Sequence, residues 1–100
     1  MKSINQYITE RLFIKKKTYN YFPETKEELK EIINNRIEKE GNEVDLNDID
    51  TSEITDMSNL FANMNKFNGN ISNWDVSNVT DMSYMFYNCK LKEKYKPKFK

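Results

Sequence analysis

The chain has 100 residues, a formal net charge of zero, 37% hydrophobic residues and 32% charged residues. This length and composition predict one domain with a modest core, in which the 13 aromatic side chains supply much of the buried area. The sequence contains no histidine, the commonest general base and metal ligand, and its two glycines cannot build a glycine-rich phosphate loop. We therefore expect a protein that is not an enzyme and that holds no metal and no cofactor.

The charges are distributed unevenly along the chain. The net charge is +4 over residues 1–22, −8 over residues 23–65, −1 over residues 66–89 and +5 over residues 90–100. This pattern predicts an acidic middle and basic ends. The N-terminal segment lacks the apolar run of a signal peptide, and no segment approaches the roughly 20 apolar residues of a membrane span. We expect a cytoplasmic protein without a membrane partner.

Two elements are predicted before residue 23. Residues 3–14 have an apolar face at helical spacing, and Ser3 with Gln6 has the spacing of a capping box at the start of this helix. Thr18–Phe22 is aromatic and β-branched and stops at a proline, which favours a short strand. Lys15–Lys17 lies between them, either as a solvated helix end or as a binding patch.

A second helix is predicted between Thr25 and Gly41. Thr25 and Glu28 have the spacing of a capping box, and Gly41 stands where a helix often ends in a left-handed residue. The inner face of this helix is formed by Leu29, Ile32, Ile33, Arg36 and Ile37. The outer face is rich in Lys and Glu, and its Glu27 and Glu31 are candidates for contact with a basic partner.

A segment of fifteen residues occurs twice in the chain. Residues 50–64 read DTSEITDMSNLFANM and residues 75–89 read DVSNVTDMSYMFYNC, and eight of these fifteen pairs are identical at an offset of 25 residues. A period of this size indicates stacked supersecondary units, and we expect each unit to contain a short strand, a polar turn and a short helix. The helices would begin at Thr55 or Asp56 and at Thr80 or Asp81.

The apolar residues of the repeat have the spacing of a helix face. The two short helices would bury Met57, Leu60, Phe61 and Met64, and Met82, Met85, Phe86 and Cys89. Cys89, the single cysteine, therefore stands at a core position, with a reactive or metal-binding thiol as the alternative. The connection between the copies contains Asn68–Gly69, a turn signal.

The C-terminal segment alternates. Lysine occupies every even position from 90 to 100, while Leu91, Tyr95 and Phe99 stand at odd positions. An extended segment would place the lysines on one face and the apolar side chains on the other. Two interpretations stay open: a solubilising strand that covers the open end of the repeat stack, and a basic arm for nucleic acid or for an acidic protein surface.

The second copy of the phrase resembles a known repeat. WDVSNVTDMSYMF, from Trp74 to Phe86, is similar to the 25-residue repeat of BspA-type bacterial surface proteins and mycoplasma lipoproteins. The first copy departs from it, with Ile49 in place of Trp and Thr51 in place of Val. The resemblance implies a leucine-rich-repeat-like solenoid that binds other molecules and does not catalyse. Residues 1–45, with INQYITERL and YNYFPETKEELKEII, also resemble a leader found before such repeats in small phage and prophage proteins.

These observations predict an α+β fold: a short leucine-rich-repeat-like solenoid of two strand–helix coils, capped by an N-terminal helical segment. Residues 1–45 would form a helix–strand–helix cap, residues 46–89 the two repeats, and residues 90–100 a Lys-rich strand or tail, all in one compact domain. Two repeats are too few to stand alone, so the ends need covering.

The expected function is that of a non-enzymatic protein–protein interaction module. The resemblance to phage proteins implies a phage-encoded inhibitor of a host or defence protein such as a nucleic-acid-handling enzyme. Tyr84 and Tyr87 replace Asn59 and Ala62 of the first copy and are candidate interface residues. The other candidates are Glu27, Glu31, Lys94, Lys96 and Lys98. The alternatives are a nucleic-acid-binding protein that uses the Lys-rich arm, a detached surface-adhesin module, and a homodimer formed through an open end of the stack.

Overall fold

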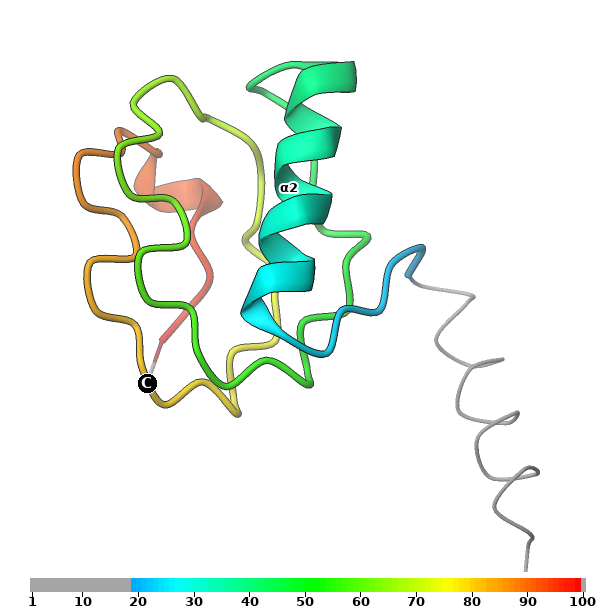
Figure 1. Ribbon diagram of the computed structural model, residues 1–100. Helices are drawn as coiled ribbons and strands as arrows, with labels where there is room; N and C mark the ends of the chain where they lie inside the picture. Colours follow the sequence, from blue (N-terminus) through cyan, green and yellow to red (C-terminus); the bar gives the residue numbers. More distant parts are fainter. Residues whose placement is uncertain (1–18, 100) are drawn as a thin grey trace, which may run out of the picture.

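The computed structural model describes residues 19–99 (Figure 1), so the predicted helix at residues 3–14 lies outside the described part of the chain. Within residues 19–99 there are one α-helix, α2 (Lys26–Glu40), and one short 3-10 helix, η1 (Glu93–Tyr95). The only strand-like pairings in this part are two isolated β-bridges, Tyr21 with Ile49 and Asp56 with Asp81. The predicted solenoid of strand–helix coils is therefore wrong, and so is the predicted strand at residues 18–22 as far as it is described.

The helix α2 forms where the sequence predicts it. The Thr25 side chain accepts a hydrogen bond from the Glu28 N–H at 3.2 Å, which caps the first turn. The box is not completed, because the Glu28 carboxylate contacts the Thr25 hydroxyl and not its backbone. Gly41 ends the helix with φ of 91°, and its N–H donates to the Ile37 carbonyl. Leu29 and Ile33 are fully buried, so this face of α2 enters the core.

Arg36 fastens α2 to the chain that enters the repeats. Its guanidinium donates to both carboxylate oxygens of Asp48, at 2.9 and 3.1 Å, and to the Asp45 carbonyl at 3.3 Å. It also pairs with Glu40 on the same helix and lies 5.2 Å from the centre of the Tyr21 ring. Arg36, at the margin of the predicted inner face, therefore holds α2 against this segment through polar contacts.

Each copy of the repeat is a series of tight turns in place of a strand and a helix. In the first copy, N–H groups of Leu60, Ala62 and Met64 donate to carbonyls three residues earlier, and the second copy repeats this at Met85, Tyr87 and Cys89. Asn59, Asn63, Tyr84 and Asn88 have positive φ, between 56° and 65°. A backbone with a left-handed residue at every fourth position cannot continue an α-helix, so the two predicted short helices are wrong.

Asp or Asn side chains form small turns at regular positions in both copies of the repeat. Six side-chain oxygens accept the N–H of the second residue on, which closes a small turn: Asp45, Asp50, Asp56, Asn70, Asp75 and Asp81. These residues form three pairs at an offset of 25 residues. The predicted helix caps Asp56 and Asp81 are therefore turn formers, and the structural repeat begins at residue 45, before the identical phrase.

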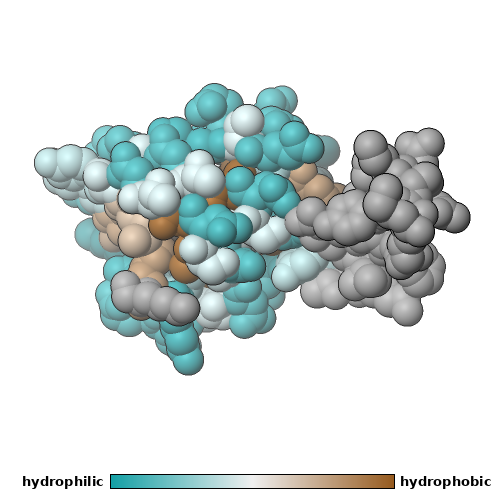
Figure 2. All heavy atoms as spheres, turned by 90° about the horizontal axis from the view of Figure 1, so that it is seen from below, coloured by the Kyte–Doolittle hydropathy of each residue, from teal (hydrophilic) through white to brown (hydrophobic). Residues whose placement is uncertain are grey.

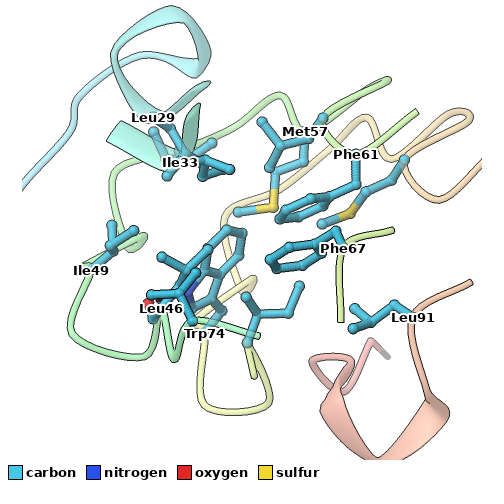
Figure 3. Packing of buried hydrophobic residues seen from close by; sticks show 14 residues of the cluster. Leu29, Ile33, Leu46, Ile49, Met57, Phe61, Phe67, Trp74 and Leu91 are labelled. Carbon is cyan, nitrogen blue, oxygen red and sulfur yellow. Dashed lines mark hydrogen bonds between the residues drawn. The ribbon is translucent and has the colours of Figure 1, made fainter. Parts of the chain in front are cut away.

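The core lies between α2 and the turns of both copies (Figure 3). The Phe61 ring stacks on Phe67 with centroids 4.7 Å apart, and Trp74 and Phe86 lie 5.8 Å from it. The Trp74 indole N–H donates to the Leu46 carbonyl at 2.9 Å, so the one polar atom of this buried ring is satisfied. Phe61, Phe67 and Trp74 are the aromatic members of the buried cluster, whose other members are aliphatic residues and methionines.

Gly69 allows two parts of the chain to approach closely. A Cβ atom at this position would lie 2.7 Å from the Phe67 ring and would overlap the Val44 carbonyl oxygen. Glycine is needed here because it has no side chain, and not because the backbone is left-handed. The Leu46 N–H donates to the Asn70 carbonyl immediately after it, which joins the start of the first copy to the start of the second.

The C-terminal segment packs onto the repeats without forming a strand. Leu91 is buried, Tyr95 is half-buried, and the Ile71 N–H donates to the Tyr95 carbonyl at 3.0 Å. The predicted strict alternation of faces fails, because Lys96 is partly buried and η1 interrupts the extended backbone. Seen from below, the surface is largely hydrophilic, with apolar atoms gathered chiefly on one side of this face (Figure 2).

Candidate functional site

The two copies of the repeat are joined by backbone hydrogen bonds, which run from the first copy to the second along residues 57–63 and in the opposite direction only where Thr80 and Asp81 donate to the Thr55 carbonyl. In Figure 1 the first copy (green) and the second (orange) zigzag side by side. N–H groups of the first copy donate to carbonyls of the second at 2.7–2.9 Å, in the pairs Met57–Asp81, Asn59–Ser83, Phe61–Met85 and Asn63–Tyr87. Because the direction is the same along residues 57–63, this part of the stack has an outer edge of carbonyls on the first copy and an outer edge of N–H groups on the second.

The carbonyl edge is covered by α2. The Lys26 ammonium donates to the Ser58 carbonyl and hydroxyl at 3.3 and 3.0 Å, and the Lys30 ammonium donates to the Leu60 carbonyl at 2.5 Å. Burial lowers the pKa of Lys30 from its ordinary value of 10.5, with a smaller opposing effect from nearby Cys89. Lysine side chains therefore take the place of the backbone donors that a preceding repeat would supply.

The N–H edge of the second copy is open. Its four outward N–H groups, those equivalent to the bonded donors of the first copy, belong to Met82, Tyr84, Phe86 and Asn88. Within residues 19–99 these four groups have no hydrogen-bond partner. We call them the donor edge. Unpaired N–H groups in a row are a template for pairing with another chain.

Two tyrosines stand on this edge, at the positions where the copies differ. Tyr84 is 68% exposed and Tyr87 is 58% exposed, and their rings meet edge to face with centroids 5.9 Å apart. Tyr84 has φ of 56°, a conformation that suits the equivalent Asn59 and disfavours a tyrosine. A large exposed ring held in an unfavourable backbone conformation points to a function beyond folding.

The predicted lysines of the C-terminal segment lie at the same end of the molecule as the donor edge. Lys94, Lys96 and Lys98 line a cavity of about 480 Å³ together with Phe86, whose N–H belongs to that edge. The Lys96 ammonium lies 4.9 Å from the centre of the Phe86 ring and pairs with Glu93 at 2.7 Å. Lys98 and the exposed Phe99 also line a neighbouring cavity with Trp74 and Met82, among other residues.

The predicted acidic residues Glu27 and Glu31 lie elsewhere. They are exposed on α2 and line a cavity of about 600 Å³ with Lys26, Lys30 and residues of the first copy. This cavity adjoins the carbonyl edge, whereas the tyrosines adjoin the donor edge. The structure thus brings the predicted lysines toward the second copy, which carries the tyrosines, and leaves the two glutamates apart from them.

Two carboxylates that the sequence repeats are tied to neighbouring serines. Hydrogen bonds from the Ser58 hydroxyl and N–H lower the pKa of Asp56 from its ordinary value of 3.8. The same bonds from Ser83 lower the pKa of Asp81. Both side chains are turn formers, and no group of three or more potential metal ligands is found within residues 19–99. Cys89 is half-buried against the core, as predicted for an apolar position.

Sequence reasoning named the two tyrosines as candidates, and it missed the donor edge. The edge consists of backbone groups, and its existence depends on which way the two copies stack. One signal was present in the sequence: three of the four non-glycine positions with positive φ hold asparagine, Asn63 and its equivalent Asn88 together with Asn59, and asparagine tolerates positive φ better than most residues. No helix in the described part of the chain is long and apolar enough to cross a membrane.

The geometry defines a small protein of stacked turns with a 25-residue repeat. Residues 27–96 match the family described as "Mycoplasma protein of unknown function, DUF285", and the chain belongs to this family. The match confirms a mycoplasma-type repeat and includes both copies and most of α2. Searches of curated proteins and of solved structures found no match.

Proposed function

We propose that this protein is a non-enzymatic interaction module that binds a protein partner through the outer side of its second repeat copy. The observation that carries the proposal is Tyr84: its ring is 68% exposed and packed edge to face on Tyr87, on a backbone conformation that costs free energy. Exposed tyrosines are frequent anchors of protein interfaces, since they bury a large area with few rotatable bonds. The first copy, which faces α2, has Asn59 and Ala62 at these positions.

The proposal is tested by capture of a partner with three forms of the full chain. Wild-type protein, the double variant Tyr84→Asn with Tyr87→Ala, and the double variant Glu27→Gln with Glu31→Gln are immobilised and exposed to lysate of cells that carry the gene. The tyrosine variant should lose the partner that wild type retains, with a weakening of at least roughly thirtyfold once the partner is purified. The glutamate variant, altered at the other edge, should keep it.

The outcome that contradicts this proposal is a tyrosine variant that folds and still binds the wild-type partner with unchanged affinity. Circular dichroism and thermal unfolding of all three forms provide the check on folding. If instead the glutamate variant alone loses the partner, the binding surface lies on α2, and the tyrosines are not the anchors.

A finer proposal concerns the setting. The similarity of residues 1–45 to phage leaders supports a protein made in the cytoplasm of an infected cell, with a host or defence protein as its partner. Expression of the chain in a host should then change the outcome of phage infection, and the tyrosine variant should not. No change with wild-type protein at comparable expression would count against this setting and leave the binding surface open to another partner.

Nucleic acid is the second candidate partner. Lys94, Lys96 and Lys98 supply positive charge, but Lys96 is engaged by Glu93 and Phe86, and Tyr95 is half-buried instead of free to stack on bases. Binding to a single-stranded oligonucleotide that falls steeply with salt would favour this candidate. We place it second because Tyr95, one of the two aromatic side chains predicted to stack on bases, is half-buried, which leaves only the exposed Phe99.

A further inference from the structure

We propose that the donor edge binds an extended, acidic segment of the partner protein, whose backbone carbonyls accept hydrogen bonds from Met82, Tyr84, Phe86 and Asn88. This inference rests on the proposed function, because it states what kind of partner segment the tyrosine-bearing copy receives. It concerns the backbone of that copy, whereas the proposed function concerns its tyrosine side chains.

The first step concerns hydrogen-bond chemistry. The donor edge presents one N–H group at every second residue and no outward carbonyl in the same row, so its occupant must supply acceptors at the same spacing. The molecule contains one instance of such a pairing, since the second copy supplies carbonyls at every second residue to Met57, Asn59, Phe61 and Asn63 of the first. A peptide segment that adds at an open edge in this way gains affinity from its main chain.

The second step excludes a second copy of this chain. Head-to-tail stacking would bring the carbonyl edge of one molecule to the donor edge of the next, but Lys26 and Lys30 already occupy that carbonyl edge. Two-fold pairing of donor edges would place N–H groups opposite N–H groups, with no acceptor between them. Neither symmetric nor head-to-tail association satisfies the edge, so the occupant is a different chain.

The third step concerns charge. From the second copy to the end of the described chain, residues 75–99 contain five lysines, at even positions from 90 to 98, against Asp75, Asp81 and Glu93. Three of these lysines line the cavity beside Phe86, and Phe99 is exposed next to them. Carboxylates on the partner segment would pair with the lysines, while the apolar side chains receive its uncharged positions.

The test measures exchange of individual backbone amides in the isotope-labelled full chain by NMR. The probe is a synthetic peptide with the sequence of residues 80–89, Cys89→Ser, flanked at both ends by two glutamates; the matched control has lysines in place of the glutamates. We expect the acidic peptide to slow exchange at Met82, Tyr84, Phe86 and Asn88 by about tenfold or more. Exchange at the bonded amides of the first copy should stay unchanged, and the control peptide should have little effect.

Three results would overturn the inference. The first is that the acidic peptide binds without slowing exchange at the four amides, or that it does not bind at millimolar concentration. The second is equal protection by the lysine control or by a single-stranded oligonucleotide, which would remove the acidic segment as the occupant. The third is protection that grows with the concentration of the protein alone, which would assign the edge to a second copy.

The test separates the two proposals. If the tyrosine variant loses its captured partner but the acidic peptide leaves the four amides unprotected, the proposed function stands and the edge inference fails. If the peptide protects the four amides but the tyrosine variant keeps its partner, the edge inference stands and the tyrosine anchor fails. Lys94→Gln with Lys98→Gln should weaken the peptide about tenfold at low salt, and wild-type affinity in that variant would also remove the charge argument.

Discussion

Tyr84 is expected to lower the stability of the protein, and its replacement by asparagine should raise it. The residue has φ of 56°, in the left-handed region, where the equivalent residue of the first copy is Asn59 with φ of 59°. A side chain with a Cβ atom in this region costs roughly 1–2 kcal/mol, and asparagine adopts it more readily than tyrosine does. A residue selected for folding alone would therefore be asparagine at both positions.

The magnitude requires separating the backbone from the ring. Tyr84 and Tyr87 pack edge to face, and such a contact contributes at most about 0.5–1.5 kcal/mol beyond area burial, with exposed rings at the lower end. The Tyr87→Ala background removes this contact beforehand. In that background we expect Tyr84→Asn to raise the free energy of unfolding by about 1 kcal/mol, which corresponds to roughly 4–8 °C in Tm for a domain of this size.

The assay is urea unfolding at equilibrium, with the slope m required to stay constant between variants. The matched control exchanges the roles: Tyr87→Asn in the Tyr84→Ala background, at a position whose φ is negative, should give no gain. An unchanged or lower stability for Tyr84→Asn in the Tyr87→Ala background would refute the reasoning. Equal gains at both positions would also refute it, because the effect would then come from removing an exposed ring.

Three further predictions concern the fold. Gly69→Ala should destabilise the protein by about 1–3 kcal/mol in urea unfolding, because the added Cβ overlaps the Val44 carbonyl; stability within error of wild type would contradict the close approach. Trp74→Phe should cost about 1 kcal/mol by the same measurement, since a buried carbonyl loses its indole donor, and a neutral result would remove that bond from the account. The carboxyls of Asp56 and Asp81 have lowered pKa values, so their contribution to stability is complete above the ordinary pKa of 3.8 and is lost as the pH falls through their pKa values in the folded protein. In thermal unfolding from pH 5 to 2, the double variant Asp56→Asn with Asp81→Asn should therefore lose less Tm than wild type, and an identical loss of Tm would contradict this prediction.

The sequence predicted what depends on neighbours along the chain. The helix α2 begins after Thr25 and ends at Gly41 because both signals act within one turn of the helix. The period of 25 residues is also present in the structure, since equivalent residues of the two copies form equivalent turns. Burial of Phe61 follows from the apolar spacing of the first copy, whereas burial of Phe67, in the connection between the copies, was not predicted.

The conformation within each copy was not predictable in the same way. Apolar residues at positions 57, 60, 61 and 64 have helical spacing, but a chain of turns with left-handed residues at Asn59 and Asn63 buries Met57, Leu60 and Phe61 and half-buries Met64. What decides between the two is the backbone bonding of Asn59 and Asn63 to the second copy, which is distant in sequence. The spacing of apolar residues within one segment cannot reveal a hydrogen-bond partner that is distant in sequence.

The candidate site divides along the same line. Tyr84 and Tyr87 could be found from the sequence, because a difference between two copies of a repeat marks what the repeat itself does not require. The donor edge could not, because the direction of stacking is set by long-range contacts such as those of Lys30 with Leu60. The separation of Glu27 and Glu31 from the tyrosines follows from the placement of α2 on the opposite edge.

The most direct test of the central claim, that the repeat stack has one bonded and one open row of donors, is amide exchange in the free protein. The two rows are matched by the repeat itself: Met57, Asn59, Phe61 and Asn63 against Met82, Tyr84, Phe86 and Asn88. We predict that exchange in the first row is slower by at least about a hundredfold than in the second, measured residue by residue at low protein concentration. Equal exchange in the two rows, or protection of the second row in the monomer, would contradict the direction of stacking and the open edge with it.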